Sequence, residues 1–315
     1  ADASSASFPS RKLTTFGGEF ATWHSAGRTA YFSLGNAFFT YNLDSAKAVE
    51  DRLKKKKAAE EKEKESGELK KDKKATDSVK TDKVVKAEAK KDEKKDEGYQ
   101  PSEMRIKVSV PRDLPQGKLL LQNARIITMK GDEVLSKGDV LVVNNRIKSV
   151  AKSISTPKGA QVIDVSGKTI VPGFVDVHSH MWPSWGIHKT QVWIYAANLA
   201  YGVTTTRDPQ TATTDVLTYS DMVEAGQIMG PRVYSTGPGV GYWFYNVKDS
   251  AQAENILKQY SKYYNTQYIK MYLTGNRQTR QWIIHAARNQ KLMPTTEGGL
   301  DFKLNMTNLL DGYPG

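Results

Sequence analysis

The stretch Phe174-Val175-Asp176-Val177-His178-Ser179-His180 decides the fold and most of the chemistry of this chain. Side chains of a strand alternate between its two faces, so an extended 174–180 puts His178 and His180 on one side, close enough to hold one metal ion. The run 168–174 predicts a second apolar strand, broken at Pro172-Gly173. By itself, H-x-H is more often one packed and one solvated histidine. The surrounding sequence has to decide between the two interpretations.

Beyond residue 174 the sequence alternates between short apolar strands and helical patterns. The expected strands are 203–207, 232–236, 268–272 and 293–297, and the expected helices are 187–201, 215–225, 251–264 and 277–289. This alternation predicts parallel strands with crossover helices, in an open α/β sheet or a (β/α) barrel. Before it, five short strands at 119–121, 125–129, 139–143, 146–150 and 161–165 predict a small sheet or sandwich. Asn144-Asn145 between two of them is typical of a hairpin turn.

The N-terminal part has a different sequence pattern. Aromatic and β-branched runs at 21–23, 29–34 and 38–43 predict a three-stranded meander. The alternating run 105–111 predicts an edge strand that completes this sheet. His24 is expected to be structural or exposed.

A charged segment separates these strands. Residues 51–97 hold 18 Lys and Arg against 14 Asp and Glu, with no aromatic residue, so a solvated insert, helical or disordered, is expected. The formal charge of +12 raises the hypothesis of a nucleic-acid-binding arm. Mixed signs and missing aromatics argue against it, so no nucleic-acid partner is expected. The chain has no cysteine, which excludes disulfides and thiolate metal sites, and no apolar run long enough to span a membrane.

Four motifs carry a family resemblance. In order they are 163–180, with the H-x-H, then 201–208, 230–234 and 269–272. From about residue 118 onward the chain resembles the amidohydrolase superfamily, in its imidazolonepropionase and prolidase-like branch. Residues 23–32 resemble a blade of a TolB-type propeller, which suggests a propeller–amidohydrolase fusion.

The resemblance implies an α/β fold: an incomplete metal-dependent (β/α) barrel, preceded by a small β-sandwich and a remnant propeller blade. The implied domains are a blade at 1–45, the charged insert at 46–99, a closing strand and linker at 100–116, the sandwich at 117–172 and the barrel at 173–315. The sixth-strand histidine and eighth-strand catalytic aspartate of the family have no counterpart before Gly315. We therefore expect a fragment of a longer enzyme that does not turn over by itself, with no catalytic residue of its own.

The resemblance also assigns the site. It implies one or two divalent ions, with zinc as the first choice, held by His178, His180 and a carboxylated Lys270. Without the family resemblance, Lys270 would be interpreted as a lysine at the end of a strand that reaches solvent or a carboxylate. The family's fifth-strand histidine is replaced by Glu297, which is either a fourth ligand or a pocket or loop residue. Trp182, Asp208 and Tyr272 are predicted to line the substrate pocket, although an N-cap role for Asp208 stays open.

The predicted function is metal-dependent hydrolysis of C–N bonds in small amides, cyclic amides or short peptides. The alternative is a non-catalytic scaffold with a degenerate metal site. A homo-oligomer and a periplasmic or secreted location are further expectations.

Overall fold

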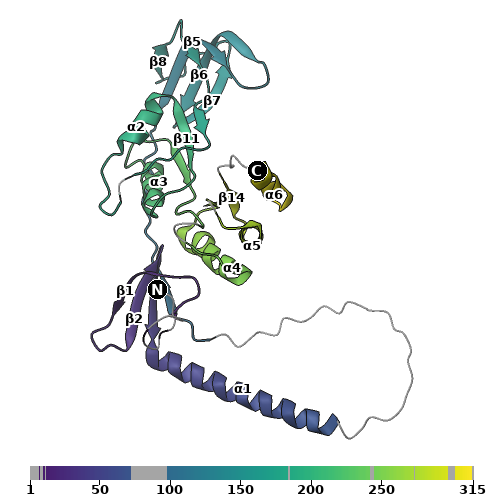
Figure 1. Cartoon of the computed structure of the whole chain (residues 1–315). Coiled ribbons are helices and arrows are strands. Elements are labelled where there is room, and N and C mark those ends of the chain that lie inside the picture. The colour runs from purple at the N-terminus through teal and green to yellow at the C-terminus, as the bar shows by residue number, and fades with distance from the viewer. Residues whose placement is uncertain are drawn as a thin grey trace. The chain divides into compact units, whose positions relative to one another are not determined.

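The computed structural model describes residues 7, 10, 12–71, 98–183, 185–241, 245–272, 274–296 and 302–313. The chain divides into two compact units, residues 1–107 and 108–315 (Figure 1).

The first unit contains a four-stranded antiparallel sheet in the order β1 (Glu19–Trp23), β2 (Thr29–Leu34), β3 (Ala37–Asn42) and β4 (Ser102–Arg105). The predicted meander is therefore present. Alternate residues of β2 and β3 are buried, and Phe32 stacks on Phe39 with ring centroids 4.8 Å apart. The fourth strand was wrongly placed at 105–111, because pairing with β3 ends at Arg105, whose guanidinium donates to Asn36 Oδ1.

A long helix follows the third strand. The helix α1 runs from Leu43 to Lys71, and it is drawn as an isolated rod in Figure 1. Most of its side chains up to residue 62 are exposed, as expected for a segment rich in both charges. The rest of the predicted charged insert, residues 72–97, lies outside the described residues. Among the helices of the described chain, none combines the length and the apolar character needed to cross a membrane.

The second unit begins with a mixed sheet. Its members are β5 (Lys118–Ile127), β6 (Val134–Val143), β7 (Arg146–Ala151), β8 (Gln161–Asp164) and β9 (Thr169–Ile170), in the order β7-β6-β5-β8 with β9 also on β5. The hairpin at Asn144-Asn145 is confirmed: both residues have positive φ, 48° and 62°, as a two-residue turn of this hand requires. Ala124, Ile126 and Val140 form its core.

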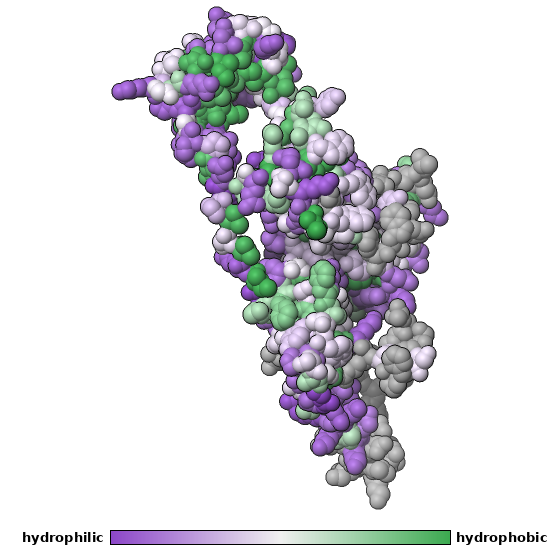
Figure 2. Space-filling view, turned by 90° about the vertical axis from the view of Figure 1, so that its left-hand side faces the viewer, coloured by the Kyte–Doolittle hydropathy of each residue, from purple (hydrophilic) through white to green (hydrophobic). Residues whose placement is uncertain are grey.

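The described residues give this region one sheet layer where a sandwich was expected. Several of its apolar side chains reach the surface, among them Ile147, Val150, Val162 and Ile163. Figure 2 shows hydrophobic residues gathered over this sheet, beside hydrophilic ones. Exposed apolar area of this kind is common at surfaces that are covered in an assembly.

Parallel strands with intervening helices fill the rest of the unit, as predicted. The strands are β10 (Phe174–Asp176), β11 (Val203–Asp208), β12 (Arg232–Ser235), β13 (Tyr268–Lys270) and β14 (Met293–Thr295). The helices are α2 (Trp193–Ala200), α3 (Asp215–Ala225), α4 (Ser250–Lys258), continued by the π-helix η2 (Gln259–Tyr264), then α5 (Arg277–Asn289) and α6 (Phe302–Leu310). Hydrogen bonds join β10-β11-β12 in one sheet and β13-β14 in another. Among the described residues, neither sheet closes on itself.

Gly173 explains the Pro-Gly break before β10. A Cβ at this position would lie 2.1 Å from Thr204 Oγ1, so only glycine lets the chain enter β10 against the start of β11. The side chains of β10 and its neighbours are therefore positioned by a close backbone approach.

The first helix after β10 starts later than predicted, at Trp193 in place of Ile187. Residues 186–189 are held in a loop instead. Gly186 has a φ of 71°, His188 Nε2 lies 2.6 Å from Asp215 Oδ1, and the Lys189 N–H donates to the Tyr219 hydroxyl. The Lys189 N–H, which would form a backbone hydrogen bond in a helical turn, is therefore bonded to a side chain instead.

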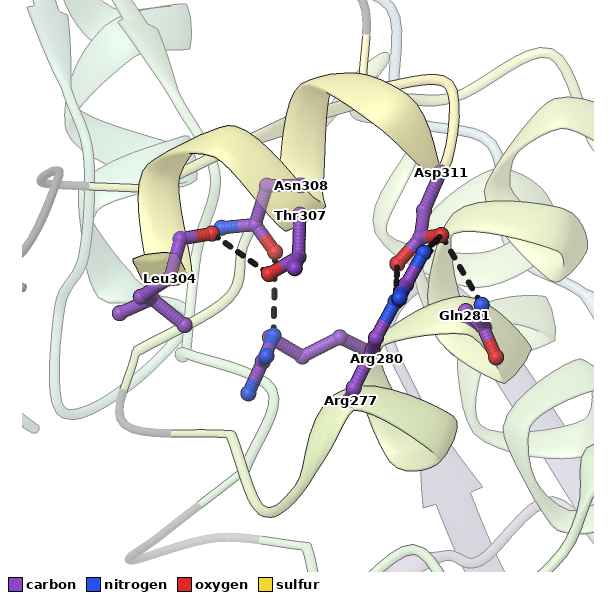
Figure 3. A network of polar contacts seen from close by, with 7 residues as sticks. All are labelled: Arg277, Arg280, Gln281, Leu304, Thr307, Asn308 and Asp311. Atoms are coloured by element: carbon purple, nitrogen blue, oxygen red, sulfur yellow. Dashed lines mark hydrogen bonds and ion pairs between the residues drawn. The ribbon is translucent and has the colours of Figure 1, made fainter. Parts of the chain in front are cut away.

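A polar network fastens α6 to α5 (Figure 3). The Asp311 carboxylate accepts hydrogen bonds from Arg277 and Gln281, and Arg280 Nε donates to Asn308 Oδ1 at 3.0 Å. The Asp311 side chain is only 5% exposed, while that of Arg277 is 50% exposed. Hydrogen bonds from Arg277 and Gln281 hold the pKa of Asp311 below its usual value.

We expect Asp311→Asn to loosen α6 while leaving the parallel strands intact. Because the folded-state pKa is lowered, the stabilisation from Asp311 is present above the ordinary pKa of 3.8 and is lost as the pH falls through the folded value. Amide hydrogen exchange at pH 7 should therefore be several-fold faster in 302–310 of the variant, and the difference should shrink in acid. Equal exchange at both pH values would show that the network contributes nothing.

Candidate metal centre

Most predicted site residues lie at or just after the carboxyl ends of parallel strands. Asp208 and Lys270 are the last residues of β11 and β13, and the two histidines follow β10. The chain after β12 connects the two sheets: the Val240 N–H donates to the Lys270 carbonyl at 2.7 Å, and Val240 pairs in parallel with Met271. The predicted site residues are thus carried at the carboxyl ends of strands from both sheets.

His178 and His180 lie side by side. Their ring centroids are 5.3 Å apart, with the rings at 73° to each other. His178 is exposed and His180 is half-buried. Two imidazoles at this separation are a suitable start for a divalent metal site.

The backbone conformation that places the two histidines side by side differs from the prediction. The strand β10 stops at Asp176, so 177–180 is not extended as expected. The Asp176 carboxylate accepts a hydrogen bond from the His178 N–H at 3.0 Å, which turns the backbone, while the Ser179 N–H still bonds to the Arg207 carbonyl. The pair is therefore placed by a side-chain turn and one contact to β11.

A backbone carbonyl sets the tautomer of His180. Its Nδ1 lies 3.2 Å from the carbonyl oxygen of Gln210. A carbonyl can only accept, so Nδ1 carries the proton in this contact and Nε2 carries the lone pair. Metal-binding histidines are commonly oriented in this way. Sequence patterns do not reveal Gln210, because the contact is made by its backbone.

Lys270 is among the large side chains that are completely buried, at 0% exposure. Its Nζ lies 5.9 Å from the centre of the Tyr272 ring, so these two residues point the same way, as predicted. Burying a charged amine is costly, so such a site favours a lysine whose charge is balanced or removed. The interpretation of Lys270 as a lysine reaching solvent is wrong.

Of the other predicted site residues, Trp182 and Tyr272 lie within the described residues and Glu297 does not. Trp182 stacks on His180, with ring centroids 5.9 Å apart and planes 25° apart. Tyr272 lies two residues beyond the end of β13. Glu297 lies outside the described residues. Roles of these residues in binding substrate or metal stay predictions.

Asp208 is fully buried behind the histidine segment. Its Oδ2 accepts a hydrogen bond from the Met181 N–H at 3.3 Å, while its Oδ1 has no partner among the described residues. The same holds for two further buried oxygens, Thr206 Oγ1 and the Tyr195 hydroxyl. Burial raises the pKa of Asp208 to about 7, although hydrogen bonds from the Met181 and Gln210 backbone oppose the rise.

This carboxyl should make stability depend on pH. Between pH values of about 4 and 7 the folded state keeps a proton that the unfolded state releases, so the unfolding free energy falls as the pH rises. We expect Asp208→Asn, which does not titrate, to gain roughly 2–4 kcal/mol relative to the wild type over that range. Urea unfolding of both metal-free proteins at pH 4.5 and pH 8 measures this. Parallel pH profiles would contradict it.

The segment after His180 is fastened at its far end. The Asp215 carboxylate accepts hydrogen bonds from Thr213 Oγ1 and the Gly186 N–H and contacts His188 Nε2. Burial alone would raise the pKa of Asp215, but these contacts together hold it below its usual value.

The candidate metal ligands among the described residues form only a small group. Within the described ranges, no group of three or more His, Asp or Glu side chains could hold a metal ion. The pair of imidazoles, one with its tautomer set by a carbonyl, fits two of the ligand positions of a divalent ion. Any further ligand would come from Lys270 or from residues outside the described ranges.

A cavity of about 590 Å³ lies elsewhere. It is lined by α3, by Thr266 and Gln267 ahead of β13, and by Lys291 and Leu292 ahead of β14. Residues of β12 and η2 also contribute to its lining, which contains none of the predicted site residues.

Comparison with known proteins finds relatives over a short part of the chain. No family model matches the chain. Curated relatives do: the chain is 41% identical over 64 residues to a dihydroorotase of Caldicellulosiruptor saccharolyticus, and 38% identical over 63 residues to dihydropyrimidinase 2 of Caenorhabditis elegans. The segments cover 20% of this chain and 15% and 12% of those proteins. Over these segments the chain is therefore similar to hydrolases of the amidohydrolase superfamily.

Solved structures agree on the fold. A molinate hydrolase matches with a TM-score of 0.52 at 15% identity, over 62% of this chain and 56% of that one. A prolidase in complex with N-methylphosphonate-L-proline matches with a TM-score of 0.51 at 17% identity, over 62% and 59%. The amidohydrolase resemblance read from the four motifs is thus confirmed, while the propeller resemblance stays a prediction. This chain spans little more than half the length of these structures and far less of the curated relatives.

Proposed function

We propose that this amidohydrolase is a metal-dependent hydrolase of C–N bonds in small amides, cyclic amides or short peptides. The observation that carries the proposal is the His178–His180 pair at the carboxyl edge of parallel strands, with the His180 tautomer set by Gln210. The names of the relatives support it, since dihydroorotase, dihydropyrimidinase and prolidase are hydrolases of such bonds.

His178, His180 and a carboxylated Lys270 would hold the ion, and Glu297 is a fourth candidate. Bound there, a divalent ion such as zinc would supply Lewis acidity and lower the pKa of a coordinated water. The chain's own contribution is positioning. The Gln210 carbonyl fixes the His180 ring, and Asp208 holds the Met181 N–H directly after it. Complete burial of Lys270 keeps bulk water from its side chain.

We further propose that the five parallel strands are part of a (β/α) barrel. The parallel order, the crossover helices and the hydrogen bonds of Val240 that join the two sheets support this. The inner surface would then include Arg207, whose guanidinium lies 4.7 Å from the Tyr268 ring centre and donates to Met293 Sδ. Side chains of three strands meeting in this way are typical of a barrel interior.

Hydrolysis of a panel tests the proposal. The purified full-length protein, loaded with zinc or manganese, is incubated with dihydroorotate, dihydrouracil and Xaa-Pro dipeptides. We expect at least one to be hydrolysed, with the activity abolished by a chelator and restored by metal. Metal binding without hydrolysis across such a panel would favour the scaffold alternative, and activity that survives complete metal removal would contradict the proposal.

A further inference from the structure

An exposed tryptophan sits directly against the candidate metal centre. Trp182 is 54% exposed, and one face of its indole stacks on His180 at 5.9 Å. A large apolar side chain that stays in water is common, but one that also touches a candidate ligand is placed where a substrate would lie.

The backbone of Trp182 is strained. Its φ is 42°, in a region that non-glycine residues rarely adopt. Such strain persists only where neighbouring contacts impose it. Here Met181 is fully buried in the core formed with Tyr195 and Tyr219, and its N–H bonds to Asp208.

The other end of the segment is equally fixed. Pro183 is buried, and His188 contacts Asp215 while the Lys189 N–H bonds to Tyr219. The exposed indole of Trp182 directly follows the first of these two anchors. Little conformational entropy is lost when a ligand packs on a preorganised aromatic surface.

From these observations we infer that Trp182 is a specificity residue, forming an apolar subsite for amides that carry an aromatic or bulky apolar group beside the scissile C–N bond. The inference rests on the proposed function, because it locates the scissile bond at the His178–His180 pair. Trp185, 59% exposed on the same segment, widens the apolar surface of this loop.

Binding of ligands that cannot be hydrolysed tests the subsite without turnover. The probes are reduced-amide analogues of Phe-Ala, Ala-Phe and Ala-Ala, in which CH₂–NH replaces CO–NH. By titration calorimetry on the metal-loaded protein, we expect one phenyl analogue to bind about tenfold more tightly than the Ala-Ala analogue. Trp182→Ala should remove this preference, and Trp182→Phe should keep most of it.

Trp23→Ala is the matched control, since Trp23 is 56% exposed but belongs to the first unit. It should leave the preference unchanged. Equal affinity for all three analogues, or a preference that survives Trp182→Ala, would overturn the inference. Loss of bound metal in Trp182→Ala would also overturn it, because the indole would then be a support for His180.

Hydrolysis of the parent peptides separates the two proposals. A phenyl preference in binding without any hydrolysis counts against the proposed activity and leaves the subsite standing. Metal-dependent hydrolysis with no phenyl preference counts against the subsite alone.

Discussion

Replacing His180 by alanine is expected to weaken divalent metal binding by at least roughly 100-fold, since loss of a ligand should exceed the 10- to 100-fold cost of removing a group that merely orients one. His178→Ala should have an effect of the same size, because the two rings lie 5.3 Å apart and would share one ion. Competition with a chelating dye measures the affinity, and hydrolysis should be lost in parallel.

His285→Ala provides the matched control for this prediction. His285 is an exposed histidine on α5, and its removal should leave metal affinity unchanged. If all three variants bound metal as the wild type does, the His178–His180 pair would not be a metal site. If the control also lost metal, the assay would be reporting on stability of the fold.

The second large effect is expected at Lys270, where two substitutions separate the loss of the amine from the loss of packing. Lys270→Met keeps a long side chain in a completely buried position, so the unfolding free energy should stay within about 1.5 kcal/mol of the wild type. Lys270→Ala leaves a cavity and should cost about 2–5 kcal/mol. Both variants should lose metal-dependent hydrolysis, because both remove the amine that would be carboxylated.

Carbon-13 NMR tests the proposed modification itself. Metal-loaded wild-type protein incubated with labelled bicarbonate should acquire a carbamate carbonyl signal that Lys270→Met lacks. A fully active Lys270→Met variant would exclude Lys270 from the site. An active wild type without the signal would exclude carboxylation and retain a role for the free amine.

Sequence patterns anticipated the elements that depend on local chemistry. Asn144-Asn145 tolerates the two positive φ values of its hairpin, and Gly173 is required by the approach of Thr204. The order of parallel strands followed from the alternation of short apolar runs with helical periods. These features are fixed by nearby residues, which is why the sequence alone predicts them.

Features set by distant contacts were missed. The late start of α2 at Trp193 depends on His188 meeting Asp215, 27 positions away. The orientation of the His180 ring depends on the backbone carbonyl of Gln210, and a residue of any type at that position has such a carbonyl. Asp208 was expected at a pocket or cap, but its burial against Met181 depends on how α2 packs on β11.

Anomalous X-ray scattering from zinc-loaded crystals of the protein would test the central claim most directly. We predict a zinc peak about 2.0–2.1 Å from one ring nitrogen of His178 and from Nε2 of His180. A well-occupied zinc ion bound elsewhere, with both rings free of metal, would contradict the account.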